Sequence, residues 1–98
     1  MTTYLKPIHD SKKSFYNKAM VSIDTVLFNS NTELKAQDEK HLYSYNTEVC
    51  YIDNINNVHL LPLWNYSATT LRHVKEFLKQ NGFKADNKRQ IEKDYFNR

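Results

Sequence analysis

The chain has 98 residues, of which 40% are apolar and 26% are charged, values that are ordinary for one globular domain. A chain of this length buries roughly two-thirds of its unfolded surface, so one modest core forms without disulfides. One glycine excludes the glycine-rich phosphate loops, and one cysteine excludes an internal disulfide. Residues 1–14 show no hydrophobic period, so we expect a loosely ordered N-terminal arm before a single domain over residues 15–98.

No apolar stretch is long enough for a signal peptide or for a membrane-spanning helix, which requires about 20 apolar residues. The longest candidate, Val58–Trp64, is interrupted by Pro62. We therefore expect a cytoplasmic protein without a membrane partner, in which the single thiol stays reduced.

Alternating apolar and polar residues predict strands in the first half of the domain. From Phe15 to Phe28 the apolar residues recur with a period of two, which is typical of a half-buried strand. The polar cluster Asn29–Thr32 predicts a turn. A short strand around Leu34 and Ala36 follows, and we expect a second turn at Asp38–Lys40.

The clearest predicted strand is His41–Ile52. The turn-forming segment Asp53–Asn57 then predicts a hairpin that returns the chain along Val58–Trp64. All of these connections are short, and short connections favour antiparallel neighbours because parallel strands need long crossovers. The pattern predicts a three- to four-stranded antiparallel meander.

Two helices are expected after this meander. Ser67 is a favourable N-cap for the first helix, and Gly82 stands where a left-handed residue closes a helix. Asn87 and Gln90 resemble a capping box for the second helix. Four residues form the apolar stripe of the first helix and two form the seam of the second: Leu71, Val74, Phe77 and Leu78, then Ile91 and Tyr95. The expected fold is an α+β domain with two C-terminal helices.

Positive charge is concentrated at the C-terminal end. Residues 1–66 carry six Lys and Arg against seven Asp and Glu, whereas residues 67–98 carry eight against four. Helical spacing places Arg72, Lys75 and Lys79 away from the apolar stripe. Such a stripe binds phosphates or an acidic protein surface, although a solvated helix face is the simpler interpretation, and we favour it.

Tyrosine is abundant, with seven residues, and three of them share one side of the predicted strand over His41–Ile52: Tyr43, Tyr45 and Tyr51. An exposed row of this kind stacks bases or anchors a protein partner. Alternatively, the rings form the inner face that covers the helix. We favour the inner face, because the opposite side carries Ser44, Asn46 and Glu48 and is more polar.

The residues that could support catalysis or metal binding are few: His9, His41, His59, His73 and Cys50. They show no paired short spacing of the kind that zinc sites use. A hairpin centred near residues 54–55 would bring Cys50 close to His59, as half of a metal site or as a Cys–His nucleophile pair. We favour a buried thiol and an ordinary surface histidine, and we expect His73 to face solvent. No catalytic constellation, metal site or cofactor is predicted.

Two segments of the chain have a distinctive pattern. The first is the Ser-Tyr-Asn-Thr segment at 44–47. The second begins with the pattern W-x-x-S-x-T-T-x-R-H at 64–73 and ends with Gln-Asn-Gly-Phe at 80–83. Together they resemble a family of small proteins, mostly of unknown function, that are encoded by phages and mobile elements of Gram-positive bacteria. The resemblance implies a phage or mobile-element origin, and proteins of this kind inhibit host defence, as anti-CRISPR proteins do.

The leading hypothesis is a non-enzymatic protein that occupies the surface of a host defence protein, with a type II CRISPR RNA-guided nuclease as the first candidate. The residues expected to contact it are Tyr43, Tyr45, Tyr51, Arg72, Lys75 and Lys79. The alternative is nucleic-acid binding by the two basic C-terminal helices as a helix-turn-helix-like pair, with Lys88, Arg89 and Lys93 on the phosphate backbone. A third hypothesis is a zinc-containing interaction domain that uses Cys50 and His59.

Overall fold

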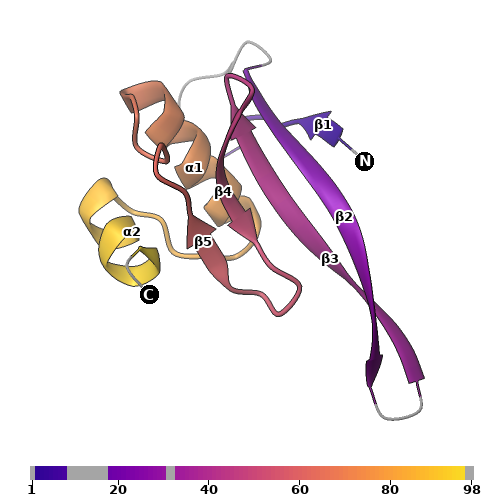
Figure 1. The fold of residues 1–98 in the computed structure, drawn as a ribbon. Coiled ribbons are helices and arrows are strands. Elements are labelled where there is room, and N and C mark those ends of the chain that lie inside the picture. The colour runs from indigo at the N-terminus through magenta and orange to yellow at the C-terminus, as the bar shows by residue number, and fades with distance from the viewer. Residues whose placement is uncertain (1, 9–17, 31–32, 97–98) are drawn as a thin grey trace.

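The computed structural model describes residues 2–8, 18–30 and 33–96. These residues form one antiparallel sheet with its strands in chain order, followed by two helices (Figure 1). The strands are β1 (Thr2–Tyr4), β2 (Ala19–Ser30), β3 (Glu33–Ser44), β4 (Thr47–Ile52) and β5 (Val58–Leu60), and the helices are α1 (Ala68–Gln80) and α2 (Lys88–Tyr95). The predicted α+β class is confirmed, with five strands in place of three or four.

The additional strand, β1, comes from the segment expected to be a loose arm. Thr2–Tyr4 pair with residues 20–22 of β2, and the backbone N–H of Leu5 donates to the carbonyl of Ala19 at 2.8 Å. The Leu5 side chain is buried in the core. Residues 2–5 are therefore tied to the edge of the sheet, while residues 9–14 of the expected arm, including His9, lie outside the described residues.

β2 and β3 pair without interruption from Ala19–Ser44 to Ser30–Glu33, so the turn expected at Asp38–Lys40 is wrong. The two strands extend past the helices as a twisted ribbon (Figure 1). Polar residues are compatible with a solvent-exposed strand. Across the ribbon, Thr25 Oγ1 donates to Asp38 Oδ1 at 3.0 Å. Of the turn predicted at Asn29–Thr32, the first two residues are the last of β2 and pair with residues 33 and 34 of β3, and residues 31–32 lie outside the described residues.

The predicted continuous strand His41–Ile52 is also wrong, because a two-residue turn divides it into the end of β3 and all of β4. Tyr45 and Asn46 have φ angles of 53° and 67°, and Ser44 pairs with Thr47 across them. Positive φ at both central residues is what a type I′ hairpin turn requires. A two-residue turn shifts the phase of the alternation by one residue, because Ser44 and its partner Thr47 share a face. The register shift between Leu42 and Tyr43 restores the phase, so that Leu42 and Cys50 share a face and the pattern continues without a visible break.

The hairpin predicted at Asp53–Asn57 is confirmed, and it joins β4 to β5. The strand predicted over Val58–Trp64 is shorter than expected, because β5 ends at Leu60. After β5 the chain turns, with the N–H of Trp64 donating to the carbonyl of Leu61 at 3.0 Å. These turns place the indole of Trp64 in the core, where it is 2% exposed.

The ends of α1 follow the sequence prediction closely. Ser67 Oγ accepts a hydrogen bond from the N–H of Thr70 at 3.1 Å. At the other end Gly82 has a φ of +83°, and the N–H of Phe83 donates to the carbonyl of Leu78 at 2.9 Å. This is a Schellman closure, in which the residue without a Cβ takes the left-handed conformation.

The start of α2 differs slightly from the predicted capping box. Asn87 Oδ1 accepts from the N–H of Gln90 at 2.9 Å, as expected. The Gln90 side chain reaches back to the N–H of Asp86 at 2.7 Å, one residue before the position that a capping box uses.

Both helices pack on the same face of the sheet. The core that they enclose contains the aromatic and aliphatic residues Leu5, Ala19, Leu42, Val49, Cys50, Ile52, Val58, Leu60, Trp64, Val74, Phe77, Leu78, Ala85 and Ile91. Neither α1 nor α2, the helices of the described chain, is long and apolar enough to cross a membrane.

Candidate functional site

The strand register assigns two different sets of side chains to the two faces of the sheet. Leu42 pairs with Cys50, and Cys50 pairs with Leu60; all three are buried under the helices, on what we call the covered face. The alternate residues lie on the other face, over which no described helix packs. We call this the open face and define it by Met20, Ser22, Asp24, Glu39, His41, Tyr43, Glu48, Tyr51 and His59, with Asp53 beside His59.

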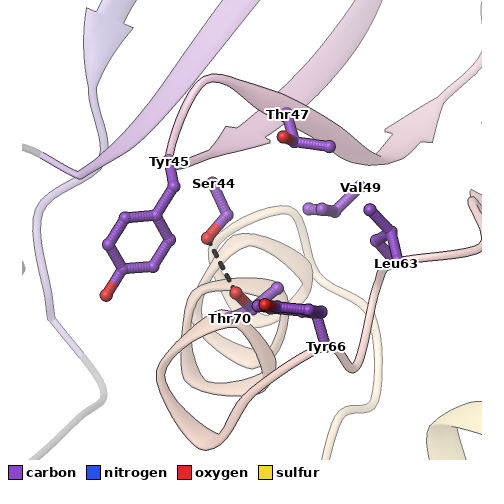
Figure 2. Close-up of a pocket in the computed structure, with 7 residues that line it drawn as sticks. All are labelled: Ser44, Tyr45, Thr47, Val49, Leu63, Tyr66 and Thr70. Carbon is purple, nitrogen blue, oxygen red and sulfur yellow. Dashed lines mark hydrogen bonds between the residues drawn. The ribbon is translucent and has the colours of Figure 1, made fainter.

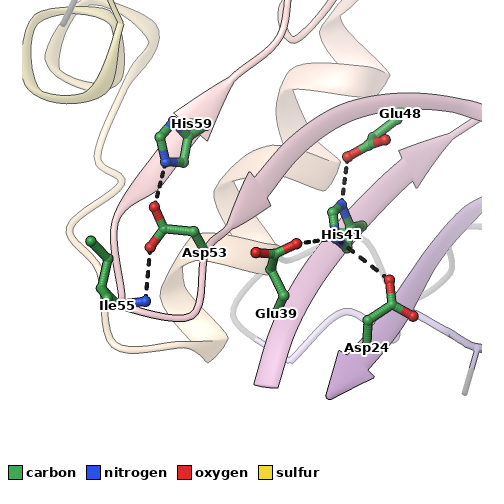
Figure 3. A network of polar contacts seen from close by, with 7 residues as sticks. All are labelled: Asp24, Glu39, His41, Glu48, Asp53, Ile55 and His59. Atoms are coloured by element: carbon green, nitrogen blue, oxygen red, sulfur yellow. Dashed lines mark hydrogen bonds and ion pairs between the residues drawn. The ribbon is translucent and has the colours of Figure 1, made fainter. Parts of the chain in front are cut away.

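His41 is the centre of an acidic cluster on the open face (Figure 3). Its Nδ1 lies 2.7 Å from Glu48 Oε2, and its Nε2 lies 3.1 Å from Glu39 Oε1 and 3.7 Å from Asp24 Oδ2. Burial by itself lowers the pKa of His41, but the hydrogen bonds and charges of Glu48 and Glu39 outweigh it and raise the pKa above its ordinary value. The protonated ring donates from both nitrogens, so it suits two carboxylates better than the neutral ring does.

Three rings stack side by side across the open face. Tyr51 lies 5.3 Å from the ring centroid of His41, with an interplanar angle of 20°. On its other side it lies 4.5 Å from the ring of His59, with an angle of 12°. The three residues are direct cross-strand partners on β3, β4 and β5, so the register itself creates the row.

His59 is held in this row by Asp53, as Figure 3 shows. Asp53 Oδ2 lies 2.7 Å from His59 Nε2, while Oδ1 accepts the N–H groups of Ile55 at 3.1 Å and of Asn57 at 2.9 Å. Burial acts to raise the pKa of Asp53, but these bonds to the ionised carboxylate prevail and lower it. One carboxylate therefore shapes the β4–β5 turn and also orients the last ring of the row.

A pocket of about 330 Å³ lies between the β3–β4 turn and the start of α1. We call it the hairpin pocket; its lining consists of Ser44, Tyr45, Thr47, Val49, Leu63, Tyr66 and Thr70, none of which is charged. Figure 2 shows Ser44 and Thr70 joined by a hydrogen bond, with the ring of Tyr45 on one side and Tyr66 and Leu63 on the other. The Ser44 and Thr70 hydroxyl oxygens are 3.1 Å apart.

Behind this pocket, Ser44 Oγ also lies 2.9 Å from Nδ1 of His73. A serine beside a histidine is the beginning of a nucleophilic site. Here, however, Ser44 is 2% exposed and His73 is fully buried, so the pair is enclosed between the hairpin and the helix. Its evident role is to hold the β3–β4 hairpin against α1 by satisfying buried polar groups. The expectation that His73 faces solvent was wrong.

The three predicted tyrosine contacts divide between two places. Tyr43 and Tyr51 lie on the open face, so the favoured interpretation, in which they form the inner face against the helix, was wrong. Tyr45 lies in the hairpin turn, half-exposed, with its ring 6.0 Å from that of His73. Leu42 and Ser44 of β3 face the helices instead, and the Ser44 hydroxyl is satisfied inside the core by Thr70 and His73.

The predicted basic residues lie in the helical layer, on the other side of the sheet from the open face. Arg72, Lys75 and Lys79 are half-buried on α1. Lys88, Arg89 and Lys93, the candidates for nucleic-acid binding, are exposed on α2. The α1 cations are therefore separate from Tyr43 and Tyr51, with which they were grouped.

The proposed pairing of Cys50 with His59 was wrong. Cys50 lies opposite Leu60, is fully buried on the covered face, and has a thiol pKa raised by burial. His59 lies on the open face, opposite Tyr51. A one-residue difference in register puts two side chains on opposite faces of a sheet. Within residues 2–8, 18–30 and 33–96 no three His, Cys, Asp or Glu side chains are grouped so that they could hold a metal ion.

Sequence reasoning missed the His41 cluster and the Ser44–His73 contact. A signal for the first was present: Glu39, His41 and Glu48 are placed together once β3 and β4 form a hairpin at Tyr45–Asn46. Because residues 41–52 were predicted as one continuous strand, neither this hairpin nor the cluster that it creates was expected. For the Ser44–His73 contact the sequence carried no such signal, because the two residues are 29 positions apart in the chain.

The chain belongs to a family of unknown function, DUF8033, whose match covers residues 3–93. No curated protein and no solved structure matches the chain.

Proposed function

We propose that this protein is a non-enzymatic binding protein that inhibits a host defence protein by occupying part of its surface. We also propose a phage or mobile-element origin, action in the cytoplasm of the host bacterial cell, and a type II CRISPR RNA-guided nuclease as the first partner to test. The choice of partner rests on the resemblance of the segments 44–47 and 64–83. The mode of action is supported by the hairpin pocket, in which those two segments meet.

The observation that carries this proposal is the gathering of exposed apolar side chains around the hairpin pocket. Tyr45 and Leu63 are each 47% exposed, and Tyr66 is 76% exposed. All three line the same hollow, whereas singly exposed apolar residues are common on any protein surface. A concave site with aromatic walls is what binding hot spots use, because a partner side chain that fills it is shielded from water.

The backbone of Tyr45 supports the same conclusion. A tyrosine in the left-handed region destabilises its turn by roughly 1–2 kcal/mol relative to a residue that tolerates positive φ. Strain of this kind concentrates at functional sites, where it positions a side chain for contact. In this turn it directs a large ring to the rim of the hairpin pocket, with Lys18 Nζ 5.4 Å from the ring centroid.

A plasmid-cleavage assay with the guide-loaded nuclease tests the proposal. We expect the purified protein to suppress cleavage and the variant Tyr66→Ser to lose this effect. Ile55→Ser is the matched control, because Ile55 is 70% exposed on the distant β4–β5 turn. Circular dichroism of both variants verifies that they are folded.

Undiminished cleavage at a large molar excess of the protein contradicts the nuclease as partner. Equal inhibition by Tyr66→Ser and Ile55→Ser contradicts the hairpin pocket as the contact. Turnover of a small substrate that is lost in Ser44→Ala contradicts the non-enzymatic proposal as a whole.

A second candidate, nucleic-acid binding, is favoured by the exposure of Lys88, Arg89 and Lys93 on α2. It ranks lower because residues 81–87 separate the helices, and the turn of a helix-turn-helix has only 3 or 4 residues. Titration of a labelled DNA duplex at two salt concentrations tests it. Phosphate contacts impose a steep salt dependence, so an affinity that barely changes with salt contradicts this function.

A further inference from the structure

The charge of the open face is opposite to that of the whole chain. Four carboxylates lie on it: Asp24, Glu39, Glu48 and Asp53. Among the described strand side chains on this face there is no Lys or Arg, although the chain has a net charge of +3. Its acidity therefore comes from the way the fold distributes charge and not from composition.

We infer that the open face docks a basic, arginine-bearing surface of a partner protein. The inference builds on the proposed function, because it states the chemistry of the partner surface that this protein occupies. It concerns a second contact area, distinct from the hairpin pocket.

The first argument is the excess of negative charge around one imidazole. Asp24 and Glu39 are direct cross-strand partners, an arrangement in which like charges repel. Glu48 approaches the same ring from β4, so three carboxylates share the single charge of protonated His41. A second cation placed beside them would relieve this repulsion.

The second argument is the availability of Asp24. Glu39 and Glu48 are within hydrogen-bond distance of His41, but Asp24 is 3.7 Å away and its side chain is 64% exposed. Ser22, the cross-strand partner of His41, is small. The ring of His41 is therefore covered by Tyr51 on one side and bordered on the other by the short side chain of Ser22 and the exposed carboxylate of Asp24.

The third argument selects arginine over lysine. A guanidinium group is planar, stacks on aromatic rings and binds a carboxylate through two parallel hydrogen bonds. The open face offers both kinds of contact together, because the outer face of His41, away from Tyr51, lies at the end of the row beside the carboxylates of Glu39 and Asp24. A lysine ammonium would use the carboxylates alone. Nucleic acid does not fit, because its phosphates carry the same charge as this face.

Two described lysines lie at the sheet itself, and both have contacts away from the His41 cluster. Lys40 Nζ donates to Asn81 Oδ1 at 2.6 Å, and Lys18 Nζ lies 5.4 Å from the ring centroid of Tyr45. The described cations of the helical layer, Arg72, Lys75, Lys79, Lys84, Lys88, Arg89 and Lys93, lie on α1, on α2 or in the segment between them. These helices pack on the covered face, so the sheet itself separates their charges from the open face.

The test is a titration of the isotopically labelled protein with a nine-residue oligo-arginine peptide, followed by NMR chemical shifts. We expect the shifts to concentrate on β2–β5 at the open face, and oligo-lysine of the same length to bind more weakly. The double variant Asp24→Asn/Glu39→Gln should weaken the arginine peptide about 5-fold, as expected for two exposed charge pairs. The matched control is Asp86→Asn/Glu92→Gln, which removes two exposed acids from the helical side.

Shifts that concentrate on α1 and α2, equal weakening in the two double variants, or no binding of the peptide would each overturn the inference. The proposed function is judged separately, by inhibition of the nuclease. If Asp24→Asn/Glu39→Gln inhibits the nuclease as well as the natural chain does, the open face is not the docking surface, while the proposed function stands. If the peptide maps to the open face but the natural chain does not inhibit the nuclease, the proposed function fails and the inference about this surface stands.

Discussion

The two faces of this sheet are formed by alternate residues of the same strands, yet they satisfy their side chains in different ways. On the covered face, Leu42, Cys50 and Leu60 are removed from water by the helices, and their contribution is hydrophobic burial. On the open face, His41 and His59 remain partly exposed and are held by carboxylates and ring stacking. Residues that stabilise the core and residues that offer binding chemistry therefore alternate along each strand, because successive side chains point to opposite faces of the sheet.

The covered face should dominate stability. Phe77 is 1% exposed between α1 and the sheet, so Phe77→Ala should lower the free energy of unfolding by about 3–5 kcal/mol, through lost transfer energy and a residual cavity. Tyr51→Ala, on the open face, should lower it by less, about 1–3 kcal/mol, because two stacked ring pairs are lost. Urea denaturation of both variants measures the difference. Equal destabilisation would contradict the division between the faces.

The polar contact at the boundary of the covered face should have the next largest effect on stability. Ser44→Ala removes the hydroxyl that joins Thr70 and His73, and it leaves polar groups buried without this partner. The expected loss is about 1–3 kcal/mol of unfolding free energy. Thr47→Ala, an exposed residue of the same hairpin, is the control and should change stability by less than about 0.5 kcal/mol. A Ser44→Ala protein as stable as this control would show that the contact is unimportant.

The strained turn of the hairpin pocket should respond in the opposite direction. Tyr45→Asn places a residue that tolerates positive φ in the type I′ turn, so stability should rise by up to about 1 kcal/mol. Nuclease inhibition should fall at the same time, because the ring at the rim is lost. Thermal melting and the cleavage assay, performed on one preparation, measure both effects. Unchanged inhibition would remove Tyr45 from the proposed contact.

The smallest effect should be a pH dependence on the open face. The neighbouring carboxylates raise the pKa of His41 in the folded state, so its stabilisation is complete below the unfolded value of 6.5 and is lost as pH rises through the folded pKa. The stability difference between the natural chain and His41→Asn should therefore be larger at pH 5.5 than at pH 8.5. Urea denaturation at the two pH values measures it; a constant difference, or a larger one at pH 8.5, contradicts the assignment.

Much of the fold could be predicted because its signals are local. The cap at Ser67, the closure at Gly82 and the cap at Asn87 each depend on residues within one helical turn. The antiparallel order also followed, since short connections permit little else. The hairpin at Tyr45–Asn46 was missed because tyrosine is an unusual residue for positive φ and the flanking alternation hid the turn.

The candidate site was predicted less well, for a physical reason. Tyr43, Tyr45 and Tyr51 were selected for their number and spacing, but the side of the sheet on which a strand residue lies depends on which alternate set the helices cover. That choice was decided by the burial of Leu42 and Cys50 and by the hydrogen bonds of Ser44 to α1. Polar residues such as Ser44 can enter a core once a distant partner satisfies them, and no local pattern reveals that partner.

The amino-acid sequence alone determined the α+β class, the two helices with their ends, and the concentration of positive charge in the C-terminal third. Only the tertiary structure decided that β1 pairs with β2, that His41 collects three carboxylates, and that two separated segments enclose the hairpin pocket. Propensity and capping act over a few residues, whereas register and packing join residues far apart in the chain, where a shift of one position exchanges the faces of a strand.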